Sequence, residues 1–277
     1  MRVARFTEGG RTRLGIVKGD DVVDSGDETD VGALISSGRL NSFTANGSRF
    51  ALDSVRLEAP IVQPPEFLAI GLNYADHVAE SGMKKPDMPI VFNKQVSCIT
   101  GPYDPIEVPT VAPALVDYEG ELGVVIGTRC RNVSVDDAPS VVAGYLVVND
   151  VSVRDWQRAS PTMTMGKSWD THGPTGPWLV TRDELADPHH LRIRTWVDDE
   201  LRQDASTAQM ITNCWELIAF LSTAFTLLPG TIIATGTPAG VGFVMDPPRC
   251  LDAGMRVRIE IEGIGTIENP VVAQPVE

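Results

Sequence analysis

The feature that most constrains the fold is residues 117–126, where three carboxylates at alternate positions lead directly into an apolar, β-branched run. Such a run predicts a buried strand, and side chains on a strand alternate between its two faces. Asp117, Glu119 and Glu121 should therefore project from one face. Three acids beside a buried run repel one another and lose solvation unless a cation lies among them, which favours a hard divalent metal held by oxygen ligands. The alternative is a solvated edge strand with a charged outer face.

A fourth carboxylate strengthens the metal interpretation. Asp150 stands at or near the end of an apolar strand predicted from Gly144. A solvated charge would be poorly placed directly after that run, because burial of an unpaired carboxylate is costly. Asp150 is therefore a candidate third metal ligand.

A short predicted helix carries a candidate acid–base pair. Asn73 could cap this helix and Gly82 could end it. His77 and Glu80 are three residues apart and would share a face, where the carboxylate can orient the imidazole as a general base requires. Residues 84–89 follow as a flexible loop, so the helix could belong to a lid. The alternative is a surface His–Glu pair of little consequence.

The remaining patterns predict mostly strands and shaped loops. The first sixty residues form short strands with turns, and alternation predicts strands at residues 191–198 and 256–261. Ser134 opens one predicted helix, and Asn213 caps a second that runs through Phe225. Glycine-rich loops occupy residues 166–178 and 236–242. Gly166-Lys167-Ser168 resembles the end of a phosphate loop, but the upstream glycine of that motif is absent.

Composition narrows the classes of function. The formal net charge of −14 disfavours nucleic acid or an anionic membrane as the main partner, although a local metal can still attract a small anionic substrate. The four cysteines are far apart and indicate neither a zinc site nor a disulfide framework. No apolar run suits a signal peptide or a membrane span, so we expect a cytoplasmic protein.

Five motifs, in order along the chain, resemble the fumarylacetoacetate hydrolase family. The matching residues are Gly71-Leu72-Asn73-Tyr74-Ala75-Asp76-His77, Asp117-Tyr118-Glu119-Gly120-Glu121-Leu122, Asn149-Asp150 with Arg154 and Gln157, Gly166-Lys167-Ser168 with Asp170-Thr171, and Thr235-Gly236-Thr237-Pro238 with Gly240-Val241-Gly242. The resemblance extends from about Phe67 to the end of the chain. It includes acylpyruvate and fumarylpyruvate hydrolases and the related oxaloacetate decarboxylases and isomerases.

The resemblance implies an α+β, predominantly β fold: a mixed β-roll, usually in a homodimer. We expect a small N-terminal β-rich accessory domain at residues 1–64 and the catalytic domain at residues 65–277. The implied metal is Mg²⁺ or Mn²⁺, and the implied residues fall into three groups. They are the metal ligands Glu119, Glu121 and Asp150, the catalytic residues His77, Glu80 and Lys167, and the substrate-binding residues Arg154, Gln157 and Thr237. Arg154 and Gln157 could equally be structural, and Lys167 could be a solvated loop lysine.

The implied reaction is hydrolytic cleavage of a carbon–carbon bond in a small 2,4-dioxo acid, with release of pyruvate. Decarboxylation of oxaloacetate, or decarboxylation or isomerisation of an unsaturated oxo-diacid, would use the same metal site without an activated water. A non-catalytic binding protein is a third alternative, but it would need no water-activating pair. The chain departs from many family members at His172-Gly173, where they carry an aromatic residue and then cysteine. That loop borders the expected pocket, so the departure weakens any inference about the substrate.

Overall fold

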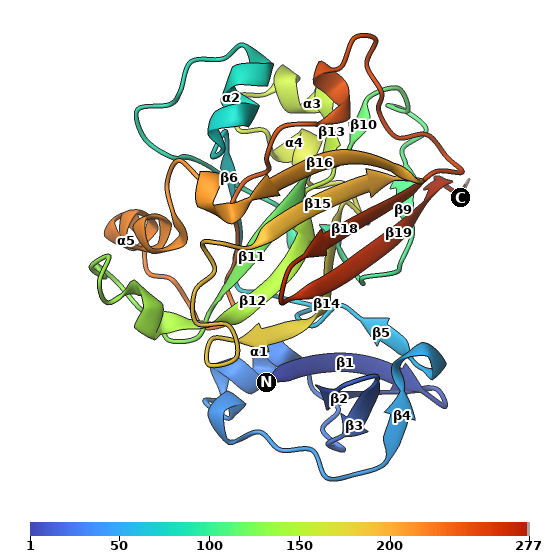
Figure 1. Cartoon of the computed structure of the whole chain (residues 1–277), viewed down its shortest axis with the longest axis vertical. Helices are drawn as coiled ribbons and strands as arrows, with labels where there is room; N and C mark the ends of the chain where they lie inside the picture. Colours follow the sequence, from blue (N-terminus) through green and yellow to red (C-terminus); the bar gives the residue numbers. More distant parts are fainter. Residues whose placement is uncertain (276–277) are drawn as a thin grey trace.

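The computed structural model describes residues 1–275, which form mainly β-strands arranged in two large sheets with short helices around them (Figure 1). This arrangement confirms the predicted α+β, predominantly β class. Among the described residues, no helix is both long enough and apolar enough to cross a membrane.

The larger sheet contains twelve strands. Ten follow the order β4-β3-β2-β1-β14-β12-β11-β17-β6-β7, while β5 pairs with β1 and β8 pairs with β14. Their bounds are β1 (Arg2–Glu8), β2 (Arg11–Lys18), β3 (Asp21–Asp24), β4 (Arg49–Ala51), β5 (Arg56–Glu58), β6 (Phe67–Gly71), β7 (Ile90–Asn93), β8 (Ile99–Thr100), β11 (Gly120–Ile126), β12 (Val142–Asn149), β14 (Gly173–Thr181) and β17 (Ile232–Ala234).

The second sheet contains five strands in the order β16-β15-β18-β19-β9. Its inner face packs on the central strands of the large sheet and forms the main core (Figure 1). Its outer face carries charged side chains. Alternation predicted the inner positions correctly, since Val257, Ile259 and Ile261 are all buried. The bounds are β9 (Ile106–Val108), β15 (Arg192–Val197), β16 (Glu200–Ser206), β18 (Arg256–Ile261) and β19 (Gly265–Ala273).

The central strands β11 and β12 are buried on both faces, which explains why their sequences are almost continuously apolar. Leu122 and Val124 of β11 join the core beneath the second sheet, whereas Val125 joins a separate core on the other side. A carboxylate on either strand is therefore buried whichever face it occupies, and must find its partners inside the protein.

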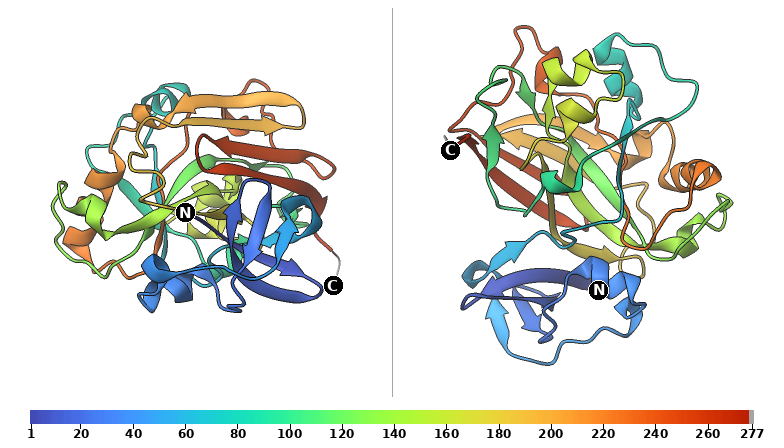
Figure 2. Two further views of the ribbon diagram at one scale, coloured as in Figure 1. Left: turned by 60° about the horizontal axis from the view of Figure 1, so that its bottom comes forward. Right: turned by 180° about the vertical axis from the view of Figure 1, so that it is seen from behind.

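The N-terminal strands extend the large sheet. β1 pairs antiparallel with β14, with Arg2 opposite Val180 and Val3 opposite Leu179. Figure 2 shows these strands gathered at one end of the molecule. Helix α1 (Val31–Ser36), capped by Asp30, packs against them.

Three of the remaining helices, α2, α3 and α4, gather at the opposite end (Figures 1 and 2). The capping prediction for α5 is confirmed: Asn213 and Glu216 form a capping box at its start. Two predictions are wrong. Asn73 does not cap α2, because its amide bonds Thr212 and Thr235, and the segment opened by Ser134 forms only a turn and a 3-10 helix. The bounds are α2 (Ala75–Ser81), α3 (Arg154–Ala159), α4 (Thr164–Lys167), α5 (Cys214–Ala224), η1 (Leu40–Ser42), η2 (Leu52–Ser54), η3 (Val96–Cys98), η4 (Ala138–Val141), η5 (Thr207–Gln209) and η6 (Gly242–Val244).

Candidate active site

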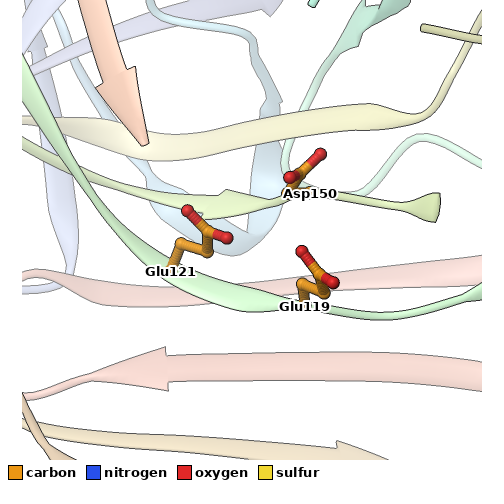
Figure 3. A group of neighbouring side chains, drawn as sticks. All are labelled: Glu119, Glu121 and Asp150. Atoms are coloured by element: carbon orange, nitrogen blue, oxygen red, sulfur yellow. The ribbon is translucent and has the colours of Figure 1, made fainter. Parts of the chain in front are cut away.

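Three of the predicted acids converge at the end of the central strands. Glu121 lies on β11, Glu119 immediately precedes that strand, and Asp150 immediately follows β12. Their carboxylates point toward one another (Figure 3), and one oxygen from each lies within 4.8 Å of the others. All three residues are buried. β11 and β12 are antiparallel neighbours, so the start of one strand meets the end of the other and brings the three acids together.

The fourth acid, Asp117, is not part of this group. The predicted continuous strand is interrupted at Tyr118 and Glu119, and Asp117 belongs to the short strand β10 (Val116–Asp117). That strand pairs with β13 (Ser152–Val153) in a separate two-stranded sheet. The prediction that all three acids of the motif lie on one strand face is therefore wrong, because tertiary contacts break the local alternation.

Two buried lysines form ion pairs with Glu119 and Asp150. Lys167, at the end of α4, donates from Nζ to Glu119 Oε2 at 2.6 Å and to Asp150 Oδ2 at 2.7 Å. Lys94 follows β7 and donates to Asp150 Oδ1 at 2.7 Å and also to the carbonyl of Lys167. Sequence reasoning identified Lys167 but missed Lys94, whose only local signal is a lysine at the end of an apolar strand. Lys167 is not a solvated loop lysine, since only 2% of its side chain is exposed.

Arg154, the first residue of α3, completes the charged cluster. Its Nη1 donates to Glu119 Oε1 at 2.6 Å and to Gln157 Oε1 at 3.0 Å. Its Nε and Nη2 both donate to Asp117 Oδ2, at 2.9 and 2.8 Å. The guanidinium is thus engaged by protein acceptors, whereas the Gln157 amide nitrogen has one hydrogen-bond partner within residues 1–275, the weak acceptor Met163 Sδ at 3.9 Å.

The acids differ in pKa because their partners differ. Burial raises the pKa of Glu119, but the charges of Lys167 and Arg154 outweigh it and hold that pKa below its usual range. Burial, reinforced by the charges of Asp150 and Glu119, raises the pKa of Glu121 well above its ordinary value. Glu121 accepts a hydrogen bond from the backbone of Gly236 at 2.8 Å, and no lysine or arginine of residues 1–275 forms an ion pair with it.

The predicted acid–base pair is formed on α2. His77 Nδ1 lies 2.8 Å from Glu80 Oε1, and the His77 side chain is 10% exposed. Glu80 Oε2 accepts a second hydrogen bond, at 2.9 Å, from the backbone of Gly240. Gly240 lies in the same loop as Gly236, whose backbone N–H donates to Glu121, so one loop contacts both the pair and the acids. Gly82 ends the helix in a left-handed conformation, as predicted.

The glycine-rich loop at residues 236–243 holds three carboxylates through its backbone. Its N–H groups at Gly236, Gly240 and Gly242 donate to Glu121, Glu80 and Asp117, respectively. Glycine is required at Gly240, where φ is +105° and a Cβ would lie 1.9 Å from the Arg202 carbonyl oxygen. The loop therefore fixes Glu121, Glu80 and Asp117 relative to one another.

Thr237 and the His172-Gly173 pair, the other positions singled out in the sequence, all contact neighbouring protein groups. The Thr237 hydroxyl donates to the Gly120 carbonyl at 3.0 Å and accepts from Gln203 at 2.8 Å. His172 is fully buried with its Nε2 2.8 Å from the Glu107 carbonyl oxygen, and burial lowers its pKa to about 4. A Cβ on Gly173 would lie 2.7 Å from Cys98 Sγ, so Cys98 fills the space that a side chain there would need.

The chemistry of the donor set fits a divalent metal. A carboxylate offers about four lone-pair sites, and the amino groups and guanidinium at Glu119 and Asp150 use only part of them. Burial and two acidic neighbours disfavour the ionised form of Glu121. A bound cation would favour that ionised form. All-oxygen ligation suits Mg²⁺ or Mn²⁺.

Comparison with known proteins identifies the family. Residues 66–272 match the model of the fumarylacetoacetate (FAA) hydrolase C-terminal domain, and residues 1–60 match a model described as Rv2993c-like, N-terminal. The first match covers well over half of the chain. The chain belongs to the fumarylacetoacetate hydrolase family.

Individual relatives carry several activities. A mitochondrial oxaloacetate tautomerase, fahd2, of Xenopus laevis is 44% identical over 234 residues, covering 84% of this chain and 73% of that protein. Fumarylacetoacetate hydrolase from Exiguobacterium antarcticum superposes with a TM-score of 0.89 at 37% identity, covering 99% of this chain and all of that one. Maleylpyruvate hydrolase from Sphingobium sp. SYK-6, solved with manganese(II) and pyruvate, gives a TM-score of 0.82 at 34% identity, again covering 99% and 100%.

Proposed function

We propose that this protein is a metal-dependent hydrolase that cleaves a carbon–carbon bond in a small 2,4-dioxo acid of the acylpyruvate type. The observation that supports the proposal is the His77–Glu80 pair: the 2.8 Å contact orients the imidazole, and Glu80 is bound by the same loop that binds Glu121. A reaction that only moves protons or releases carbon dioxide needs no group dedicated to activating water. An oriented imidazole at this position supports hydrolysis.

Each residue has a defined role in the proposed reaction. Glu119, Glu121 and Asp150 would hold Mg²⁺ or Mn²⁺, which supplies Lewis-acid polarisation of the substrate's 2-oxo group when bound. His77 removes a proton from water as the water oxygen attacks the C4 carbonyl, and Glu80 stabilises the imidazolium. Lys167 stabilises the developing oxyanion. The C3–C4 bond then breaks, the acyl group leaves as a carboxylic acid, and the bonding electron pair passes to the pyruvate enolate. The proton that His77 took from water is returned to C3, which completes pyruvate and restores the neutral imidazole.

Gln157 is the better placed of the two predicted substrate-binding residues on α3. Its amide nitrogen has only the weak Met163 sulfur contact, so it can donate to a substrate carboxylate, while Arg154 holds its carbonyl oxygen. The guanidinium of Arg154 would need to release a protein carboxylate before it could bind the substrate. We therefore assign substrate binding on this helix mainly to Gln157, with Arg154 orienting it.

A second candidate is tautomerisation of oxaloacetate, favoured by the 44% identity to the Xenopus laevis tautomerase. Keto–enol exchange needs one group to take a proton from carbon and another to supply one to oxygen. Lys167 and His77 could serve in these roles without any attack by water. Decarboxylation of oxaloacetate would need less still, because the electron pair released from the carboxylate is accepted by the oxo group.

The His77→Ala variant separates hydrolysis from decarboxylation. Hydrolysis of acylpyruvates should fall by about a hundred- to ten-thousand-fold, the usual contribution of a general base. Oxaloacetate decarboxylation should fall far less, and Mn²⁺ affinity, measured by calorimetry, should not change. Glu80→Ala should cost less than His77→Ala, because the imidazole remains but loses its orienting partner.

The chain offers a matched control in His190, which lies 3.0 Å from Asp187, also three residues away, but on the surface. His190→Ala should leave every rate unchanged. Equal loss of hydrolysis and decarboxylation in His77→Ala would remove His77 as the base and leave it only a role in closing the site. Full hydrolysis by protein shown to be free of metal would refute the metal-dependent mechanism.

A further inference from the structure

Asp117 is buried beside the candidate metal site but has no free capacity to bind a metal. Its Oδ1 accepts hydrogen bonds from the backbone of Tyr118 at 3.0 Å and Gly242 at 2.9 Å. Its Oδ2 accepts from Phe243 at 3.0 Å and from both Nε and Nη2 of Arg154. These five hydrogen bonds exceed the roughly four lone-pair sites of a carboxylate, so Asp117 has no lone pair left for a metal.

The contact with Asp117 determines which edge of the Arg154 guanidinium reaches Glu119, one of the candidate metal ligands. Asp117 occupies the Nε–Nη2 edge of the guanidinium, so only the Nη1 end remains for Glu119, where it takes a single oxygen, Oε1. A guanidinium released from Asp117 could turn its two-nitrogen edge to Glu119 and engage both carboxylate oxygens, which is the favoured geometry for this pair. Glu119 would then be a weaker metal ligand.

We propose that Asp117 is a positioning residue of the metal site: it restrains Arg154 to Glu119 Oε1, so that Glu119 Oε2, which accepts only from Lys167 among the described residues, keeps a lone pair for the metal. The inference rests on the metal site of the proposed function but not on the reaction. It gives the first acid of the Asp117-Tyr118-Glu119 motif a role different from that of a ligand.

The same carboxylate joins the restraint to the glycine-rich loop. A Cβ on Gly242 would lie 2.9 Å from Asp117 Oδ1 and 2.2 Å from the Arg249 carbonyl oxygen, so only glycine allows this approach. The other end of the loop binds Glu121 through Gly236. Asp117 therefore also anchors the loop that positions a second metal acid.

Mn²⁺ titration calorimetry on four proteins tests the proposal: the wild type, Asp117→Asn, Arg154→Met and the double variant. Asp117→Asn should weaken Mn²⁺ binding by about tenfold or more, as is usual for residues that orient metal ligands. Arg154→Met should bind Mn²⁺ at least as well as the wild type, because nothing then competes for Glu119. In that background Asp117→Asn should change affinity by less than about threefold, since no guanidinium remains to be restrained.

A purely structural role would give a different pattern. Asp117→Asn would then weaken Mn²⁺ binding equally with and without Arg154, and that result would overturn the proposal. Unchanged affinity in Asp117→Asn would overturn it as well. If circular dichroism shows that Asp117→Asn does not fold, Asp117→Ser replaces it in the same comparison of four proteins. Serine keeps an oxygen acceptor for the loop.

Asp104 provides the matched control. It also combines an arginine with backbone donation, accepting from Arg56 at 2.7 Å and from Gly101 at 2.7 Å, but it lies outside the site. Asp104→Asn should leave Mn²⁺ affinity unchanged. Failure of the wild type to bind Mn²⁺ would refute the metal site itself, whereas normal binding by both wild type and Asp117→Asn would refute only the role of Asp117.

Discussion

Two regions of the molecule carry ion pairs of similar geometry in opposite environments. In the active site, Lys94 and Asp150 lie 2.7 Å apart with both side chains fully buried. On the outer face of the five-stranded sheet, Arg192 and Asp204 lie 2.6 Å apart with 55% and 34% of their side chains exposed. The bond lengths alone would rank the two pairs as equivalent.

Their consequences for stability differ because water competes for only one of them. The exposed pair exchanges partners with solvent and is screened by salt, so it contributes little. The buried pair cannot be broken singly without leaving an uncompensated charge in the interior. Breaking one pair in this buried set of acids and bases should therefore cost the fold more than breaking a pair on the surface.

The largest expected effect follows from removing one member of that set. Asp150→Ala leaves Lys94 and Lys167 each short of an acidic partner, and should lower the free energy of unfolding of the metal-free protein by about 3–5 kcal/mol. Asp204→Ala on the outer sheet is the control and should leave that free energy nearly unchanged. Urea unfolding of both variants measures the difference, and equal losses would show that burial does not distinguish the two pairs.

The second effect depends on pH and concerns His172. The buried imidazole has a pKa of about 4, below its unfolded value of about 6.5. The unfolded chain thus binds a proton before the folded protein does, so stability is complete above about pH 6.5 and falls as pH decreases toward 4. The loss should reach about 3 kcal/mol, and His172→Phe should remove that pH dependence.

Chemical unfolding at pH 7.5 and pH 4.5 tests the role of His172. At the higher pH the variant should lose only the hydrogen bond to the Glu107 carbonyl, a matter of about 1 kcal/mol. His190→Gln, with an exposed ring, is the control and should follow the wild type. A pH dependence in His172→Phe as steep as that of the wild type would assign the acid lability to other groups.

The third effect has the opposite sign. The folded pKa of Glu121 is raised, so stability is highest below its unfolded pKa and falls as pH rises through the folded pKa. Glu121→Gln cannot ionise and should stabilise the metal-free protein at neutral pH by about 1–2 kcal/mol. Mn²⁺ should raise the melting temperature of the wild type but not of this variant, as thermal unfolding with and without the metal would reveal. Destabilisation of the metal-free variant would contradict the assigned pKa.

The smallest effect is expected on the outer sheet face. Arg192→Ala should lower stability slightly in dilute buffer, and the difference from the wild type should vanish near 1 M NaCl, where the screening length is about 3 Å. Paired urea titrations at the two salt concentrations provide the measurement. A difference that persists in high salt would mean that the arginine stem packs on the sheet.

Local signals in the sequence predicted several of the regular elements but missed others, including β14, most of which was expected to lie in a glycine-rich loop at residues 166–178. Alternation identified β18 through Val257, Ile259 and Ile261, and the capping box identified α5 through Asn213 and Glu216. These patterns succeed because the causes of the structure lie within a few residues of each other. The metal acids could be grouped for a similar reason, since unpaired acids beside apolar strands require a cation.

Long-range contacts explain what the sequence could not predict. The strand breaks between Asp117 and Gly120 because the Tyr118 hydroxyl bonds the Gly240 carbonyl and Asp117 turns toward Arg154, both of them distant in sequence. Lys94 was missed for the same reason: only the folded arrangement brings it to Asp150. Residue type and spacing cannot reveal a partner fifty or more positions away.

The loop at residues 236–243 has a consequence for how the enzyme can diversify. It binds Glu121, Glu80 and Asp117 through backbone N–H groups, which every residue except proline supplies. Its side chain at Ala239 is therefore open to variation in a library that seeks new substrates, whereas its length is not. One inserted or deleted residue would shift all three carboxylates at once, so evolution should tolerate an exchange at Ala239 far more readily than a change of length or the loss of Gly240 or Gly242, where a side chain does not fit.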